Sequence, residues 1–224
     1  MFSSSATLYG YPEAVPIPEI APIAPINPYD HTKAAVEQML SNLHASAPYY
    51  WRIACLRYFD HVGAHSSGRI GENPLGIPNN LFPFVSQVAV GRRAQLQVIG
   101  GDWHTPDGTG VRDYIHVMDL AEGHRAALNC LLAEAPQLLT LNLGSGQGQS
   151  VLEVVQAMEA ASDRSPLMRS PNVDLAMLAS ASPIPLRQLS AWAGAPSEAL
   201  KTSVEMDGPG SSRALRGMDE SIQL

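Results

Sequence analysis

The stretch "RIACLRYF" (residues 52–59) decides the fold class of this 224-residue chain. It is an almost unbroken apolar run with the length of a strand, which is typical of a strand buried on both faces of a parallel sheet. Further runs of strand length follow in "QLQVIG" (95–100), "VRDYIHV" (111–117) and "LLTLNLG" (138–144). The sequence therefore predicts a sheet with mostly parallel strands.

Segments with a helical pattern lie between these predicted strands, so helices and strands alternate along the chain. Asn27 is a suitable N-cap and Pro28 a suitable first residue for a helix over 28–44, where apolar residues recur at helical spacing. Three further segments have helical periodicity: 80–92, 118–135 and 150–162. Ser150 is a suitable cap for the last of them. Strands that alternate with helices are typical of an α/β fold.

The two ends of the chain differ from this middle part. Residues 1–10, "MFSSSATLYG", predict the end of a strand that runs into a serine-rich turn, and a proline-rich loop follows. From residue 165 the sequence is rich in Ser, Pro, Ala and Gly without a sustained period, which indicates a weakly ordered tail with a short helix at 185–191. The chain therefore divides into a structured region, 1–164, and a tail, 165–224.

Composition and charge argue against several classes of protein. With 45% hydrophobic residues, the chain is typical of a soluble globular protein. No apolar run approaches the roughly 18 residues that span a bilayer, and the first residues lack the pattern of a signal peptide. We therefore expect a cytoplasmic protein with no membrane partner. A net charge of −7 without a long basic run argues against a nucleic acid partner.

Cysteine and histidine spacing indicates neither a disulfide nor a metal site. Cys55 and Cys130 lie in apolar stretches, where thiols pack as small hydrophobic groups. His104, His116 and His124 fall in different expected elements, and the sequence has no His-x-x-x-His or Cys-x-x-Cys pair. The sequence therefore predicts no bound metal.

The only glycine-rich stretch is "GSGQGQS" (144–150), between an expected strand and an expected helix. It lacks the GxGxxG spacing of a dinucleotide-binding turn and the Gly-Lys-Ser/Thr of a P-loop. We therefore interpret it as a tight connection.

Tyr29 and Lys33 are four residues apart on the first turns of the helix expected at 28–44, so their side chains share one face. A nearby cation favours the ionised form of a phenol, which suits a general base. Chance alone gives such a pair with a probability of roughly 0.06, because the chain has seven Tyr and only two Lys. On these two residues alone, a proton-transfer pair and an ordinary face, with Tyr29 on the core and Lys33 in water, both stay open.

Longer motifs carry a specific resemblance. "FSSSATLYG", "NPYDHTK", "LRYFDHVGAHSSGRIGENPLGIPNNLFPFVSQVAVGRR", "DGTGVRDYIHVMDLAEGH" and "LNLGSGQGQSVLEVVQAM" occur in order between residues 2 and 161. Together they resemble the UDP-glucose 4-epimerase family of the extended short-chain dehydrogenase/reductase superfamily. Tyr-x-x-x-Lys marks only the superfamily, whereas "GIPNNL" with "DGTGVRDYIHV" narrows the resemblance to UDP-hexose epimerases.

The resemblance implies roles for four residues around a bound NAD. Tyr29 would be the base that removes the C4 hydroxyl proton of the sugar, with Ser5 as its hydroxyl partner. Lys33 would hold the nicotinamide ribose and favour the ionised form of Tyr29, and Tyr58 would lie near the nicotinamide. In the family, NAD takes the C4 hydride, the 4-keto sugar rotates, and the hydride returns to its other face.

The resemblance also implies the residues that hold the nucleotide half of the substrate. Asn80 and Leu81 of "IPNNL" would bind this half, and Gln97 and Ile99 of "LQVIG" would lie near the uracil. Arg112 of "VRDYIH" would bind the diphosphate, a role that suits a planar guanidinium.

Three departures from the family pattern distinguish this chain. Asp60 and His61 stand where the family usually has Asn and Pro beside the diphosphate, and a carboxylate there repels a diphosphate unless it is protonated or turned away. The glycine-rich phosphate loop of the family should precede residues 2–10 by on the order of a hundred residues, and Met1 takes its place. "MRSPNVDLAML" (168–178) stands where the family continues with "RREGD".

The resemblance implies a UDP-glucose 4-epimerase that interconverts UDP-galactose and UDP-glucose through an NAD-dependent 4-keto intermediate. It implies a partial Rossmann-type parallel sheet with a small nucleotide-sugar-binding α/β subdomain, and a dimer formed through helix 28–44. The alternative is a non-catalytic truncated isoform or fragment that dimerises with full-length epimerase.

Overall fold

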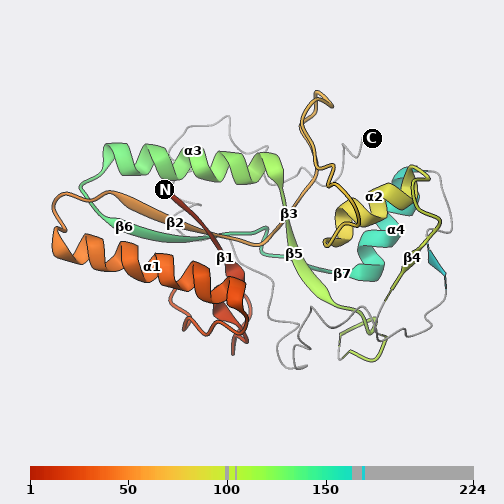
Figure 1. Ribbon diagram of the computed structural model, residues 1–224, viewed down its shortest axis with the longest axis horizontal. Helices are drawn as coiled ribbons and strands as arrows, with labels where there is room; N and C mark the ends of the chain where they lie inside the picture. Colours follow the sequence, from red (N-terminus) through yellow and green to blue (C-terminus); the bar gives the residue numbers. More distant parts are fainter. Residues whose placement is uncertain (99–100, 104, 163–167, 170–224) are drawn as a thin grey trace.

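The computed structural model describes residues 1–98, 101–103, 105–162 and 168–169. It has two lobes along its longest axis, joined by a small central sheet (Figure 1). Within the described residues, no helix is both long enough and apolar enough to cross a membrane. The predicted domain boundary at 164/165 and the predicted helix at 185–191 lie outside the described residues.

The first lobe is built on a parallel sheet of three strands, β1 (Phe2–Ser5), β2 (Ile53–Tyr58) and β6 (Leu138–Leu143), in the order β1-β2-β6. Helices α1 (Pro28–Ser46) and α3 (Val117–Ala133) lie on opposite sides of this sheet (Figure 1). The α/β fold with a parallel sheet is therefore confirmed, and the strand predicted from "RIACLRYF" is its middle strand.

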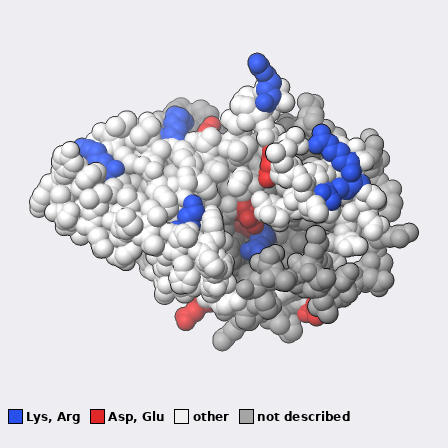
Figure 2. Space-filling view, in the orientation of Figure 1, with Lys and Arg blue, Asp and Glu red and all other residues white. Residues whose placement is uncertain are grey.

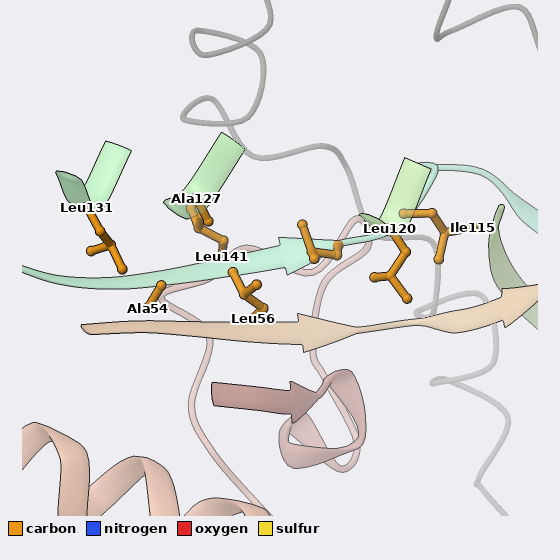
Figure 3. Packing of buried hydrophobic residues seen from close by; sticks show 8 residues of the cluster. Ala54, Leu56, Ile115, Leu120, Ala127, Leu131 and Leu141 are labelled. Atoms are coloured by element: carbon orange, nitrogen blue, oxygen red, sulfur yellow. The ribbon is translucent and has the colours of Figure 1, made fainter. Parts of the chain in front are cut away.

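The hydrophobic core of this lobe lies between α3 and the sheet. Figure 3 shows side chains of β2 and β6 pointing toward side chains of α3. Eight buried residues form this core: Ala54, Leu56, Ile115, Leu120, Ala127, Leu131, Leu141 and Leu143. Every second residue of β2 contributes because side chains alternate between the two faces of a strand.

The centre and the second lobe consist of shorter elements. β5 (Val111–His116) pairs in parallel with β3 (Asp60–Val62) and antiparallel with β7 (Gly148–Ser150). In the second lobe, the helices α2 (Leu81–Ala89) and α4 (Val151–Ser162) share one apolar cluster, and β4 (Leu96–Gln97) pairs in parallel with β8 (Met168–Arg169). β3, β7 and β8 were not expected from the sequence.

Local signals place the helix ends close to their predicted positions. Asn27 caps α1, its side chain accepting a hydrogen bond of 3.0 Å from the Asp30 amide. Ser150 and Glu153 form a reciprocal cap at the start of α4, with hydrogen bonds of 2.7 and 3.1 Å. The helix predicted over 80–92 ends earlier, at Ala89, because Gly91 takes a positive φ of 78° that breaks the helical path.

Helix α1 is attached to the sheet by charge more than by apolar packing. Only two of its residues are buried, Asp30 and Glu37, and both are acidic. The Glu37 carboxylate accepts two hydrogen bonds from Arg57 of β2, of 3.1 and 2.6 Å, and one of 2.5 Å from Ser4 of β1. Burial is the largest single influence and disfavours the Arg57 charge, but Glu37 and Tyr9 together outweigh it and raise the pKa of Arg57.

Arg57 extends this network to the loop after β1 and to β6. Its Nη1 donates to the Tyr9 hydroxyl at 2.7 Å and to the Glu19 carbonyl at 3.1 Å. Tyr9 donates to the Asn142 side chain at 2.7 Å, and the Asn142 amide donates to the Ile17 carbonyl at 2.8 Å. One buried hydrogen-bonded network therefore joins all three strands, α1 and the proline-rich loop.

The connection between β6 and β7 closes around a buried carboxylate. Asp113 of β5 accepts hydrogen bonds from the Ser145 amide at 2.8 Å, the Ser145 hydroxyl at 2.6 Å and the Gly146 amide at 2.9 Å. A Cβ on Gly144 would lie 2.5 Å from Asp113 Oδ2, so the close approach requires glycine. This geometry supports the interpretation of "GSGQGQS" as a tight connection.

We expect Glu37→Gln to lower the free energy of unfolding by about 3–5 kcal/mol, because it leaves the buried Arg57 guanidinium without its countercharge. Urea denaturation followed by circular dichroism measures the change. Glu134→Gln is the matched control, since it removes one charge at an exposed position beyond the end of α3. Equal urea midpoints for both variants would contradict the anchoring role of Glu37.

We expect Asp113→Ala to cost about 2–3 kcal/mol and Asp113→Asn less, because alanine leaves two amides and one hydroxyl of the β6–β7 connection without their acceptor. Hydrogen exchange at Ser145 and Gly146 should accelerate in the alanine variant. Asp102→Ala, at an exposed position, serves as the control. Unchanged protection of both amides would show that Asp113 does not hold the connection.

Candidate functional site

The carboxyl ends of β1 and β2 bring two of the expected site residues together. Ser5 and Tyr58 are direct partners in the parallel register of these strands. The carboxyl edge of a parallel sheet is the usual place for a ligand in this class of fold. The backbone therefore holds a hydroxyl and a phenol on neighbouring strands at this edge.

Tyr29 and Lys33 lie beside β1, on the first turns of α1. The Lys33 ammonium is 5.5 Å from the centre of the Tyr29 ring and donates a hydrogen bond of 2.8 Å to the Ser3 carbonyl. The Tyr29 side chain is 55% exposed, so the interpretation of Tyr29 as a residue on the core is wrong. The two side chains share a face, as the spacing of four residues predicted.

Ser5 has a local partner in this structure. Its hydroxyl lies 3.0 Å from that of Thr7 and also accepts from the Thr7 amide at 3.3 Å, which caps the short 3₁₀ helix η1 (Ala6–Tyr9). A hydroxyl rotates freely and has two acceptor lone pairs, so these contacts leave Ser5 able to bond a further group.

Tyr58 has a partner that the sequence did not indicate. Its hydroxyl lies 2.7 Å from the Ser3 hydroxyl and 2.5 Å from Nε2 of His124 on α3. His124 Nδ1 lies 2.7 Å from the Leu120 carbonyl, which can only accept. His124 Nδ1 therefore donates to that carbonyl, which fixes the ring beside Tyr58. The only sequence signal was the unexplained histidine in a helical pattern.

The residues expected to hold the nucleotide lie in the second lobe and on β5. Asn80 is exposed at the N-cap position of α2, without a hydrogen bond from its side chain to the helix, and Leu81 is half-buried. Gln97 is exposed on β4, and Ile99 lies outside the described residues. Arg112 is half-buried on β5. The exposed amides of Asn80 and Gln97 are available to a ligand.

Arg112 and the start of α2 belong to one neighbourhood. The ring centres of Phe82, in the first turn of α2, and Tyr114, two residues after Arg112 on β5, are 5.7 Å apart. Asp60, where the family usually has Asn, is the register partner of Tyr114 and carries a carboxylate 3.8 Å from Arg112 Nε. The Asp60 carboxylate is therefore turned toward a cation.

The described residues fit only one end of a dinucleotide. Hydroxyl, phenol and ammonium groups at the strand ends suit a nicotinamide ribose. In contrast, the amides of Ser145 and Gly146, in the glycine-rich stretch, already bind the Asp113 carboxylate where a phosphate-binding loop would keep them free. Among the described residues, no group of three or more His, Cys, Asp or Glu could hold a metal ion.

A depression of about 580 Å³ lies between α1 and the sheet, and it does not coincide with the expected site. Glu37, Arg57 and Cys55 line it, and none of the sequence-predicted site residues does. Burial and the nearby Glu37 carboxylate raise the pKa of the Cys55 thiol to about 11, so this thiol is a packing group. On the face in Figure 2, acidic and basic side chains are scattered over the described surface.

Two separate sets of groups result from this geometry. Beside β1 lie the exposed Tyr29 phenol and the Lys33 ammonium, and the Ser5 hydroxyl lies at the carboxyl end of the same strand. At β5 and α2, Arg112 offers a planar cation for a phosphate, beside amides that can bind a base. Sequence reasoning missed the groups that hold these sets in place: Glu37, Arg57, Asp113 and His124.

Known proteins resemble this chain over most of its described length. Residues 1–144 match the family model described as "NAD dependent epimerase/dehydratase family". UDP-glucose 4-epimerase 1 of Oryza sativa subsp. japonica is 58% identical over 166 residues, covering 73% of this chain and 47% of that protein. UDP-glucose 4-epimerase of Bacillus subtilis (strain 168) is 57% identical over 164 residues, covering 73% and 48%.

A solved structure agrees with these matches. UDP-glucose 4-epimerase from Bifidobacterium longum, in complex with NAD⁺ and UDP, superposes with a TM-score of 0.76 at 45% identity, covering 89% of this chain and 56% of that one. The chain spans about half the length of the curated relatives it matches. Because the family model covers well over half of its residues, the chain belongs to the NAD dependent epimerase/dehydratase family.

Proposed function

We propose that this chain has the function of a UDP-glucose 4-epimerase, interconverting UDP-galactose and UDP-glucose with NAD as cofactor. The observation that carries the proposal is the Tyr29–Lys33 pair, which is bound to β1 through the Ser3 carbonyl, in a chain 57–58% identical to UDP-glucose 4-epimerases. The cytoplasm is the proposed location.

Three residues act on the sugar in this proposal. Tyr29 accepts the proton of the C4 hydroxyl, and the Ser5 hydroxyl bonds the same oxygen. The Lys33 ammonium stabilises negative charge on the phenol oxygen. NAD, when bound, would supply the acceptor for the C4 hydride and the source from which the hydride returns to the sugar.

The remaining site residues orient the two ligands. Tyr58, whose hydroxyl is fixed between Ser3 and His124, lies beside the nicotinamide. Arg112 pairs with the diphosphate of the UDP-hexose. Asn80 and Leu81 bind the nucleotide half of the substrate, and Gln97 and Ile99 contact its uracil.

The proposed mechanism predicts the effect of removing the phenol oxygen. Tyr29→Phe should reduce the conversion of UDP-galactose to UDP-glucose by at least about 10²-fold, because phenylalanine has no oxygen to accept the proton. A coupled assay with UDP-glucose dehydrogenase, with NAD added, measures the rate. Tyr49→Phe is the matched control, since its side chain is 93% exposed beyond the end of α1. Turnover by Tyr29→Phe at the wild-type rate, or none by the wild type, would overturn the proposal.

We also propose that the chain forms a dimer through α1, as a homodimer or with a full-length epimerase. Exposed apolar side chains on this helix support a contact there, with Met39 at 69% and Leu43 at 38% exposure. Light scattering of the chain should give twice its mass of 24.0 kDa. The variant Met39→Glu with Leu43→Glu should return it to the monomer mass. A wild-type chain that scatters as a monomer would contradict the homodimer.

A further inference from the structure

Asp60 and Arg112 face each other across the parallel pair β3–β5. Arg112 Nε lies 3.8 Å from Asp60 Oδ2, and the side chains are 36% and 52% exposed, respectively. At this distance the pair is a charge contact rather than a hydrogen bond. The guanidinium therefore already has an anionic neighbour that is open to solvent.

The carboxyl group of Asp60 interacts electrostatically with its neighbours. The protein around the carboxyl raises the pKa of Asp60 by partly removing it from water, and Arg112 and His61 act in the opposite direction. On the paired strand β5, burial is the main cause that raises the pKa of Tyr114, and the nearby Asp60 charge raises it further. A second anion placed on Arg112 would meet this carboxylate at short range, and the two negative charges would repel each other most strongly at low salt.

We propose that Asp60 is a specificity-determining residue of this site, which competes with the diphosphate of a nucleotide sugar for Arg112 and leaves the binding of an uncharged nucleoside unaffected. The proposal rests on the proposed function, in which Arg112 receives the diphosphate. Asp60 therefore sets how strongly the site favours the charged ligand over its neutral part.

The test measures two ligands with the same base and different charge. UDP-glucose carries a diphosphate diester, whose charge is constant near neutral pH, and uridine carries none. In titration calorimetry at low salt, Asp60→Asn should tighten UDP-glucose binding by roughly three- to tenfold and leave uridine binding unchanged. The gain should shrink as salt is added, since screening weakens the repulsion.

Two further variants separate a local effect from a change in net charge. Glu134→Gln removes the same charge beyond the far end of α3, roughly 25 Å from β5 by the rise of a helix of 17 residues, and should leave both affinities unchanged. In the background Arg112→Gln, Asp60→Asn should lose most of its effect. Asp60→Ser should tighten UDP-glucose binding as Asp60→Asn does. It provides a second neutral side chain for the same test if the asparagine variant folds poorly.

The outcomes separate this inference from the proposed function. Equal UDP-glucose affinities in the wild type and both Asp60 variants would overturn the specificity role of Asp60 but not the proposed function. An equal gain in uridine affinity would do the same. Absence of UDP-glucose and uridine binding in every variant would overturn the proposed function, and this inference with it.

Discussion

The buried ion pair between Glu37 and Arg57 is the constraint on which the first lobe depends. Helix α1 carries the proposed base, yet Asp30 and Glu37 are its only buried residues. Apolar contact therefore contributes little to its position. Arg57 is held by Glu37, Tyr9 and a backbone carbonyl, so the desolvated charges are matched by specific bonds. Such a network fixes both the position of α1 and its rotation about its own axis.

Strand β2 joins this network to the candidate site through the alternation of its side chains. Arg57 points to the α1 side and enters the ion pair, while Tyr58, the next residue, packs beside the core under α3. Ser4 and Ser5 follow the same logic on β1, where one bonds Glu37 and the other lies opposite Tyr58. On these two strands, the anchoring residues Arg57 and Ser4 are therefore chain neighbours of Tyr58 and Ser5, on opposite faces of the sheet.

Local patterns predicted the elements whose causes are local. The caps at Asn27 and Ser150 and the apolar run at 52–59 lie where the sequence indicated, because they depend on nearby residues. The strands β3 and β7 have three residues each and exist only because β5 pairs with them. No periodicity can appear in so short a segment, so these strands could not be predicted.

The candidate site was predictable as a set of residues and not as a set of contacts. The family motifs supplied Tyr29, Lys33 and Ser5, and helical spacing alone placed the first two on one face. The contacts of Tyr58 with His124 and of Asp60 with Arg112 join residues 66 and 52 positions apart, and no local rule links them. Such contacts depend on the packing of α3 and on the register of β3 with β5.

The charged anchoring of α1 gives the first lobe two parts with different responses to temperature. Apolar burial under α3 follows the curved temperature dependence of the hydrophobic effect, whereas the cost of removing ions from water falls as temperature rises. On warming, the attachment of α1 should therefore strengthen, while the hydrophobic stabilisation of the core beneath α3 levels off. On cooling, both lose strength for unrelated reasons, so the helix that carries the proposed base is held best at the warm end of the folded range.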